Sequence, residues 1–557
     1  MHSLRYAAET AALRQNYTEK SIVIKKVLTI ATAMLAVCAG IASCKKRDAE
    51  PVLQLQVATE PAAVSAKPST GIAWFPGDVD AAFEHAKAEG KPVFLYWSAE
   101  WCPPCHELKA TLFMRPEFQG KLKLFIPVYL DGDAPGAQNW GDAFGVTAYP
   151  TIVILKSDRT ELTRIVGGMD VARYNDVLDM ALGDVQPVRQ LLASLDQNTE
   201  PLSMGDCRRL AYNGWLLDDA ITNAPTKTTE DLRRAIEGCP VDARTERARL
   251  MMAAAFASAT TDAEALKAGK PPSATTVMLV KNVSDLLADA PLALSVADTF
   301  LWLSDGFFLA AKADPKTAVE LLTRWNGVMS AIVNNSRTSD SDRCYAVANQ
   351  LRATKALSAD GKIPSELASM ARQNVDSALS RKHSEDARSS VVNGSILVLY
   401  FLGDMDRLFT VLNQEMATTK TPYYYMGGLA EIEEQRGNKD KAIGWLERSY
   451  RESKGVATRF EWGTDYVVGL VRMRPNDAAG IRLAALTVLD ELDGPDRIHS
   501  RTASRLKRLD STLREWNKAG AYKGDIAALR KRMDDICGKI PEANVARQKC
   551  DEFLANA

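Results

Sequence analysis

Apolar and polar positions follow two different patterns along this chain. From residue 72 to residue 182, apolar runs of strand length alternate with stretches in which apolar positions recur at helical spacing. The strand-like runs are residues 93–97, 124–130, 151–155 and 162–166. Runs that are apolar at nearly every position are typical of strands covered on both faces. This part is therefore predicted to be a small α/β fold with helices on both faces of a mixed sheet.

The helices of this part have recognisable boundaries. Asp78 is a favourable N-cap for a helix that Gly90 ends. A second helix follows Cys102 and is expected to end before Pro116. Pro127 lies inside the second apolar run, and proline removes a donor from the strand ladder. This run is therefore expected at a sheet edge or at a bulge.

After about residue 185 the strand pattern stops. Residues 185–557 are rich in Ala, Leu, Glu and Arg, with helical period and short polar breaks. Residues 424–449 match the small and apolar positions of a tetratricopeptide helix–turn–helix, whose repeat is about 34 residues. Residues 397–416 have a similar two-helix outline around Gly403. No regular repeat runs through the rest, so a mainly α, solenoid-like (tetratricopeptide-like) region is predicted.

A short apolar segment near the N-terminus has the features of a secretory signal. Lys25 and Lys26 precede an apolar run over residues 27–43, which is shorter than the about 20 residues of a membrane span. The run ends in Ile-Ala-Ser-Cys, which resembles the lipobox of bacterial lipoproteins. That resemblance implies lipidation of Cys44, as the mature N-terminus, on the periplasmic side of a membrane. An uncleaved anchor and a plain cleaved signal are the alternatives.

Composition narrows the function classes only a little. The chain of 557 residues is 46% hydrophobic and 25% charged, as in ordinary globular proteins. Its net charge of −1 gives no reason to expect a nucleic-acid partner. The five histidines are scattered and share no ligand spacing with cysteines, so no metal site and no cofactor are expected.

The residues most informative about chemistry are Trp101-Cys102-Pro103-Pro104-Cys105, which follow a predicted strand and open a predicted helix. At that position the helix N–H groups and the macrodipole stabilise a thiolate, which is the nucleophile in disulfide exchange. The short spacing lets the second sulfur resolve a mixed disulfide. Pro104 suits an early helical position because no hydrogen-bond donor is lost there.

Tyr149-Pro150-Thr151, just ahead of a predicted strand, resembles the cis-proline loop of the thioredoxin family. This resemblance implies that Pro150 is cis, that the loop packs on the cysteine pair, and that the backbone of Tyr149 pairs with a substrate chain. Further residues look like the C-terminal periplasmic domain of the disulfide reductase DsbD, namely residues 91–93, 105–108, Phe113 and residues 167–170. The similarity covers about residues 72–182 and favours a reductase.

The expected organisation is thus a leader over residues 1–44, a flexible linker over residues 45–71, a thioredoxin-like domain over residues 72–184 and a helical region over residues 185–557. The linker is assigned because it lacks any helical or strand period and contains several Pro, Gly and Ala residues.

One position departs from the family pattern. Many thioredoxins carry a buried aspartate six residues before the first cysteine, where this chain has Tyr96. A phenol, with an ordinary pKa of about 10, is a poor base at neutral pH, so proton transfer would use water or Glu100. Two other interpretations of the motif are a structural disulfide and a c-type haem attachment, because His106 completes Cys-x-x-Cys-His. We expect His106 to be exposed and without an essential role.

The remaining cysteines of the helical region leave several pairings open. Cys537 and Cys550, on either side of a turn, would join a helix hairpin in an oxidising compartment, and Cys207 with Cys239 is a similar candidate. Cys344 would then be left as a buried thiol. The tyrosines at residues 423–425 are expected to line the core or groove of a helical repeat.

The sequence therefore predicts a membrane-tethered periplasmic thiol–disulfide oxidoreductase, more readily a reductase. Cys102 would attack a disulfide of a protein substrate, and Cys105 would resolve the mixed disulfide. An upstream protein would donate or accept electrons. The alternative is a helical-repeat adaptor or assembly protein whose thioredoxin-like domain serves docking or redox sensing. The direction of electron flow and the client are left open.

Overall fold

The computed structural model describes residues 71–555, except 135, 147, 167–170, 184–185, 196–200, 216–223, 301–304, 495–496 and 543. The predicted leader, the lipobox cysteine Cys44 and nearly all of the predicted linker lie outside the described residues. So do residues 167–170 of the family resemblance and the expected boundary after residue 184. Among the described residues, none of the helices combines the length and the apolar character needed to cross a membrane.

The α/β part is built on one four-stranded mixed sheet. Its strands are β1 (Val93–Ser98), β2 (Ile126–Asp131), β3 (Thr151–Leu155) and β4 (Glu161–Val166), in the order β2-β1-β3-β4. β1 runs parallel to β2 and antiparallel to β3, which is antiparallel to β4. Pro127 lies in β2, an edge strand, where the missing N–H breaks no ladder bond on the outer side. Its carbonyl accepts the N–H of Phe75 at 2.7 Å.

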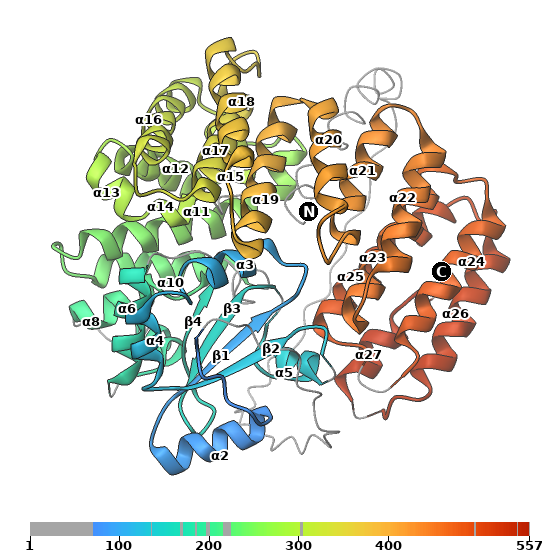
Figure 1. Cartoon of the computed structure of the whole chain (residues 1–557), viewed down its shortest axis with the longest axis horizontal. Coiled ribbons are helices and arrows are strands. Elements are labelled where there is room, and N and C mark those ends of the chain that lie inside the picture. The colour runs from blue at the N-terminus through green and yellow to red at the C-terminus, as the bar shows by residue number, and fades with distance from the viewer. Residues whose placement is uncertain are drawn as a thin grey trace, which may run out of the picture. The chain divides into compact units, whose positions relative to one another are not determined.

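Helices cover both faces of this sheet, as predicted (Figure 1). They are α2 (Val79–Glu89), α3 (Pro103–Ala110), α4 (Pro116–Leu122), α5 (Ala137–Ala143) and α6 (Val171–Leu182). Phe94 and Tyr96 of β1 point into a cluster with α3, α4 and α6, whereas Leu95 and Trp97 point into a cluster with α2 and α5. The carboxylate of Asp78 caps α2 by accepting the N–H of Ala81. Helices α4 and α5 were not predicted.

In the described part of residues 185–557, the regular elements are all helical. They are α7 (Val188–Ser194), α8 (Met204–Ala211), α10 (Pro225–Gly238), α11 (Arg244–Lys267), α12 (Ala274–Leu286), α13 (Ala290–Ser295), α14 (Ala297–Phe300), α15 (Asp305–Ala311), α16 (Pro315–Asn334), α17 (Asp340–Leu357), α18 (Ser365–Ser380), α19 (Glu385–Leu402), α20 (Met405–Met416), α21 (Tyr423–Gln435), α22 (Lys439–Glu452), α23 (Val456–Met473), α24 (Ala478–Leu489), α25 (Ser500–Trp516), α26 (Lys523–Cys537) and α27 (Val545–Asp551), with a 3₁₀ turn at Asp490–Leu492.

Both helix–turn–helix units expected from the sequence are present. The first is α19 and α20, joined at Gly403, whose φ of +75° ends α19 in the left-handed region. The second is α21 and α22, joined at Gly437 with a φ of +78°. The mainly helical character of this region is therefore confirmed.

The helical region shares an apolar core with the α/β part. The cluster that contains Phe94 continues through α7, α8 and α10 and reaches Leu357 at the end of α17. At the edge of the sheet, the N–H of Gly214 donates to the carbonyl of Arg164 in β4 at 2.8 Å. Because this core is continuous, the first helices of the region are packed onto the sheet as one folded unit.

Two disulfides staple the helical region. Cys207 of α8 is bonded to Cys239 at the end of α10, and Cys537 of α26 to Cys550 of α27. Both pairings had been left open by the sequence.

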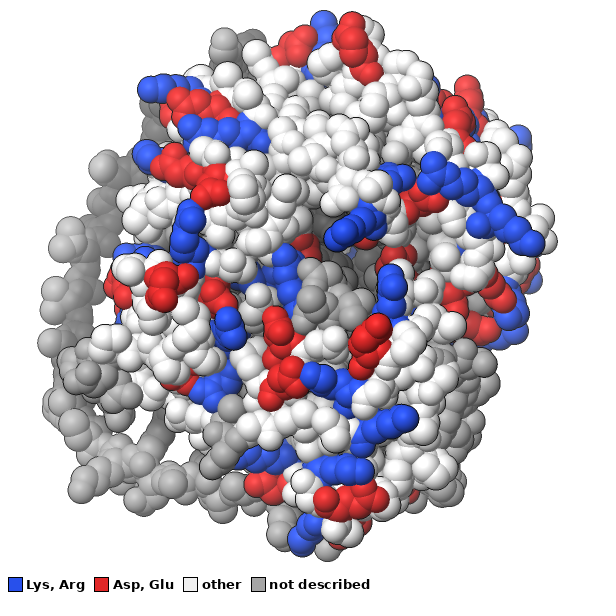
Figure 2. All heavy atoms as spheres, turned by 60° about the vertical axis from the view of Figure 1, so that its left-hand side comes forward, with Lys and Arg blue, Asp and Glu red and all other residues white. Residues whose placement is uncertain are grey.

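On the face drawn in Figure 2, basic and acidic side chains alternate, and neither sign forms a continuous area.

Candidate redox site and its covering contacts

The Cys102–Cys105 pair lies where β1 leads into α3. The two sulfurs form a disulfide with a Cα–Cα distance of 5.2 Å. Cys102 is the N-cap of α3, and its sulfur accepts the N–H of Cys105 at 3.2 Å. Pro103 and Pro104 occupy the first helical positions, where no donor is lost. In the reduced protein, this helix N-terminus would stabilise a Cys102 thiolate.

The proline loop lies against this motif. The peptide bond between Tyr149 and Pro150 is cis, as the family resemblance implies. The ring of Tyr149 is in edge contact with Trp101, with centroids 6.3 Å apart. The hydroxyl of Tyr149 accepts a hydrogen bond from the Gln138 side chain at 2.7 Å, and burial raises the pKa of this phenol to about 12. The structure thus brings the two sequence-predicted segments together.

Asp133 joins the motif to the helical region. The indole N–H of Trp101 lies 3.2 Å from the Asp133 carboxylate and 2.8 Å from the Thr458 hydroxyl. Thr458 also donates to Asp133, through its hydroxyl at 2.6 Å and its backbone N–H at 3.1 Å. Burial raises the pKa of Asp133 to about 6. Asp133 was not among the site residues predicted from the sequence, although a polar residue just beyond a strand parallel to β1 is a usable signal.

Aromatic and basic side chains also surround Trp101 and Tyr149. The guanidinium of Arg501 lies over the ring of Tyr149 at 4.7 Å and over Trp101 at 5.4 Å. Arg501 also pairs with Glu461 at 2.7 Å, and both side chains are buried. Tyr424 stacks on Trp101 with ring centroids 6.3 Å apart. These partners lie hundreds of residues from the motif, and no sequence signal pointed to them.

The buried pair of Arg501 and Glu461 gives a stability prediction. Glu461→Gln leaves Arg501 and Arg505 without their shared carboxylate, which Arg505 contacts at 2.7 Å. Because removing one partner of a buried ion pair is costly, the free energy of unfolding is expected to fall by about 3 kcal/mol. Urea denaturation measures it. Glu434→Gln, which breaks an exposed pair with Arg472, is the control and should cost under about 1 kcal/mol. Equally small losses of stability in the two variants would contradict the assignment of Arg501 and Glu461 as a stabilising buried ion pair.

The expectation that His106 is exposed was wrong. Its side chain is 16% exposed because α19 packs on α3, and Nδ1 contacts the Asp386 carboxylate. Nε2 lies 2.7 Å from the carbonyl of Glu100. On the same helix, the Ser390 hydroxyl donates to the carbonyl of Pro103 at 2.7 Å. Both ring nitrogens of His106 thus have protein partners, and this arrangement does not fit an axial haem ligand.

Tyr96 has no role as a base in this geometry. Its side chain is fully buried, and burial raises the pKa of the phenol well above its ordinary value. Its hydroxyl donates to the carbonyl of Cys105 at 3.4 Å, so it holds the backbone of α3 while remaining protonated. The expectation that Tyr96 does not replace the usual aspartate as a proton acceptor is consistent with these contacts.

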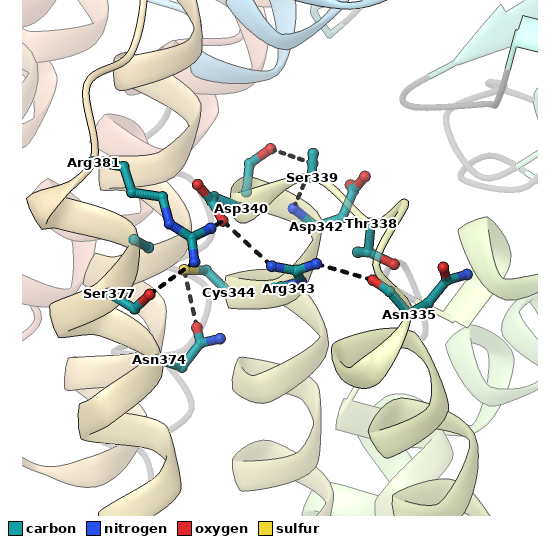
Figure 3. A network of polar contacts seen from close by, with 12 residues as sticks. Asn335, Thr338, Ser339, Asp340, Asp342, Arg343, Cys344, Asn374, Ser377 and Arg381 are labelled. Atoms are coloured by element: carbon teal, nitrogen blue, oxygen red, sulfur yellow. Dashed lines mark hydrogen bonds and ion pairs between the residues drawn. The ribbon is translucent and has the colours of Figure 1, made fainter.

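Cys344 lies apart from the redox pair, in a polar network at the start of α17 (Figure 3). Its thiol is free and buried, donates to the amide oxygen of Asn374 at 3.3 Å and lies 3.7 Å from the hydroxyl of Ser395. Burial raises the pKa of this thiol to about 11. Nearby, Arg381 pairs with Asp340. A protonated, enclosed thiol is a poor nucleophile. The prediction that Cys344 is a buried thiol is confirmed.

Comparison with known proteins identifies the α/β part. Residues 79–182 match a family model described as a thioredoxin-like domain. Thioredoxin of Pseudomonas aeruginosa is 33% identical over 103 residues, which are 18% of this chain and 89% of that protein. Thioredoxin H-type of Oryza sativa is 32% identical over 101 residues, 18% of this chain and 74% of that protein.

A third similarity is to the thiol:disulfide interchange protein DsbD of Yersinia pestis. It is 33% identical over 93 residues, which are 16% of this chain and 16% of that protein. The chain therefore matches only about a sixth of the length of DsbD, and the similarity concerns one domain of each protein.

Proposed function

Because this chain belongs to the thioredoxin family, we propose that it is a thiol–disulfide oxidoreductase acting on protein substrates through Cys102 and Cys105. The observation that carries the proposal is the disulfide at the N-terminus of α3, in contact through Trp101 with the cis-proline loop. The reduced Cys102 thiolate attacks a substrate disulfide and forms a mixed disulfide. The Cys105 thiolate then attacks the Cys102 sulfur, which releases the reduced substrate and leaves the pair oxidised.

The match to the thiol:disulfide interchange protein DsbD, together with the DsbD-like residues of the sequence, supports the direction of a reductase. A reductase must be reduced again after each cycle, so an upstream protein thiol would supply electrons to the oxidised Cys102–Cys105 pair. Thiol–disulfide exchange needs no metal or organic cofactor.

We place the protein in the periplasm, held at a membrane by a lipid on Cys44. The secretory pattern of residues 27–43 and the lipobox-like Ile-Ala-Ser-Cys support this location. The disulfides Cys207–Cys239 and Cys537–Cys550 add support, because structural disulfides persist in oxidising compartments.

Insulin reduction tests the activity. The full chain is the right material, because the α/β part shares its apolar core with α7–α17. With dithiothreitol as electron source, the protein is expected to accelerate precipitation of the insulin B chain over dithiothreitol alone. No acceleration, together with a Cys102–Cys105 pair that cannot be cycled between its oxidised and reduced forms, would rule out the oxidoreductase.

The second candidate is an adaptor in which the thioredoxin-like domain serves docking or redox sensing. The observation that favours it is the burial of the motif, since Cys102 is 2% exposed and Trp101 is 8% exposed. The insulin assay separates the two, because an adaptor would show no turnover while keeping its fold.

A further inference from the structure

Side chains of the helical region cover the rim of the redox pair. Cys102 is 2% exposed and Cys105 is 0% exposed. The covering contacts come from α19, α21, α23 and α25, through Ser390, Tyr424, Thr458 and Arg501. In disulfide exchange, the sulfur of one partner must touch the sulfur of the other. A protein disulfide cannot reach the sulfur of Cys102 while these side chains stay in place.

We propose that the surface formed by Ser390, Tyr424, Thr458 and Arg501 is a built-in cover, and that protein partners react with Cys102 only after it lifts from the motif. This inference rests on the proposed function, because a purely structural disulfide needs no access. Once the cover has lifted, the exchange proceeds as described above, with two electrons passing from the Cys102–Cys105 pair to the partner disulfide.

The four residues of the cover lie outside the apolar core that joins the sheet to the first helices of the helical region. The apolar cluster joining the sheet to the helical region runs through α7–α17 and ends at Leu357. Helix α19 packs along α3, and the four side chains of the cover contact the motif through hydrogen bonds and ring contacts. The Ser390 hydroxyl donates to the carbonyl of Pro103, and Thr458 binds Asp133 through its hydroxyl and its N–H. Lifting the cover would break these contacts and separate α19 from α3, while the shared cluster, which contains no residue of α19, α21, α23 or α25, stays intact.

Alkylation of the reduced full chain measures access to Cys102 directly. The rate constants of a small reagent, iodoacetamide, and of a bulky reagent, a maleimide carrying a polyethylene glycol chain, are each compared with those for an unfolded Cys102 peptide. Mass mapping identifies the labelled residue. Relative to the peptide, the folded chain is expected to slow the reaction of the bulky reagent by a larger factor than that of the small one. An absence of protection against the bulky reagent would overturn the cover.

Variants of the cover then test which contacts hold it. Ser390→Ala with Thr458→Val is expected to raise the bulky-reagent rate about tenfold or more, since each buried hydrogen bond contributes a factor of about two to ten. Thr458→Ser keeps the hydroxyl and should retain the slow rate. Ser449→Ala is the matched control, because Ser449 is also buried and donates to a backbone carbonyl, that of Tyr423, at 2.7 Å. An equal increase in this control would overturn the assignment.

Asp133 adds a pH dependence to the same measurement. The titratable and charged groups facing it are Asp131, Tyr149, Tyr423 and Arg501. Its pKa is about 6 under the cover, against 3.8 for an ordinary aspartate. The covered state therefore binds the proton of Asp133 more tightly than the uncovered state does. The resulting stabilisation of the covered state is complete below about pH 4 and is lost as the pH rises through about 6.

The ratio of the bulky-reagent rate to the small-reagent rate cancels the thiolate fraction, because both reagents require the thiolate. This ratio is expected to rise about tenfold between about pH 5 and about pH 7.5. In Asp133→Asn it should be nearly constant. A rise that persists in Asp133→Asn would overturn the role of Asp133, and a flat ratio in the unaltered chain would do the same. Alkylation needs access but no turnover, so this test can fail while insulin reduction succeeds, and the reverse.

Discussion

Replacing Cys105 with serine is expected to yield a protein that attacks disulfides but cannot release them. Cys102 sits at the N-cap of α3, where its thiolate is stabilised, and Cys105 supplies the sulfur bonded to it. Without Cys105, the mixed disulfide has no internal resolving thiol. Insulin reduction should fall by about 10²-fold or more, the scale of loss when a catalytic nucleophile or its partner is removed. A covalent complex with insulin should appear on non-reducing gels.

Cys102→Ser is the comparison that assigns the two roles. It should lose the same activity and form no complex, because the attacking thiolate is gone. Cys344→Ser removes a thiol outside the pair and should leave insulin reduction unchanged. A complex formed by Cys102→Ser, and none by Cys105→Ser, would reverse the roles assigned to the two cysteines.

The second large effect is expected at the N-terminus. Cys44→Ser should abolish incorporation of labelled palmitate and release the protein from the membrane fraction, because a lipid chain would be the main attachment proposed here. Cys38→Ser is the matched control and should keep the label. Cys38 lies inside the apolar run and follows Val37, which is bulkier than the residue that a lipobox favours before its cysteine. A mature protein whose mass includes no acyl chain, or a label lost only in Cys38→Ser, would contradict lipidation at Cys44.

Local features of the fold could be predicted from short-range patterns. The fully apolar strand β1, the capped helix α2 and the cysteine motif between a strand and a helix each carry their own signal. Pro127 correctly indicated an edge strand, because a missing N–H is tolerated there.

Two helices of the α/β part were missed for local reasons. Helix α3 ends at Ala110, before Pro116, as expected, but Pro116 is also the first residue of α4, a position that proline favours. Helix α5 has only seven residues, begins after Gly136 and has too few apolar positions to show helical period.

The covering contacts could not be predicted because they depend on packing between distant segments. Thr458 binds Trp101 across 357 residues of chain. His106 was expected to be exposed because its own helix gives no sign that α19 packs on it. A sequence pattern reports which side of a helix is buried, but not which distant helix buries it.

The reduction potential of the Cys102–Cys105 pair tests the central claim most directly. The full chain is equilibrated in redox buffers of graded potential, and each cysteine pair is quantified by alkylation under denaturing conditions and mass mapping. We predict a two-electron transition of Cys102–Cys105 between about −270 and −120 mV, the range of thioredoxin-fold oxidoreductases. Cys207–Cys239 and Cys537–Cys550 are internal controls that should stay oxidised until below about −300 mV. Reduction of Cys102–Cys105 only together with those two disulfides would contradict a redox-active pair.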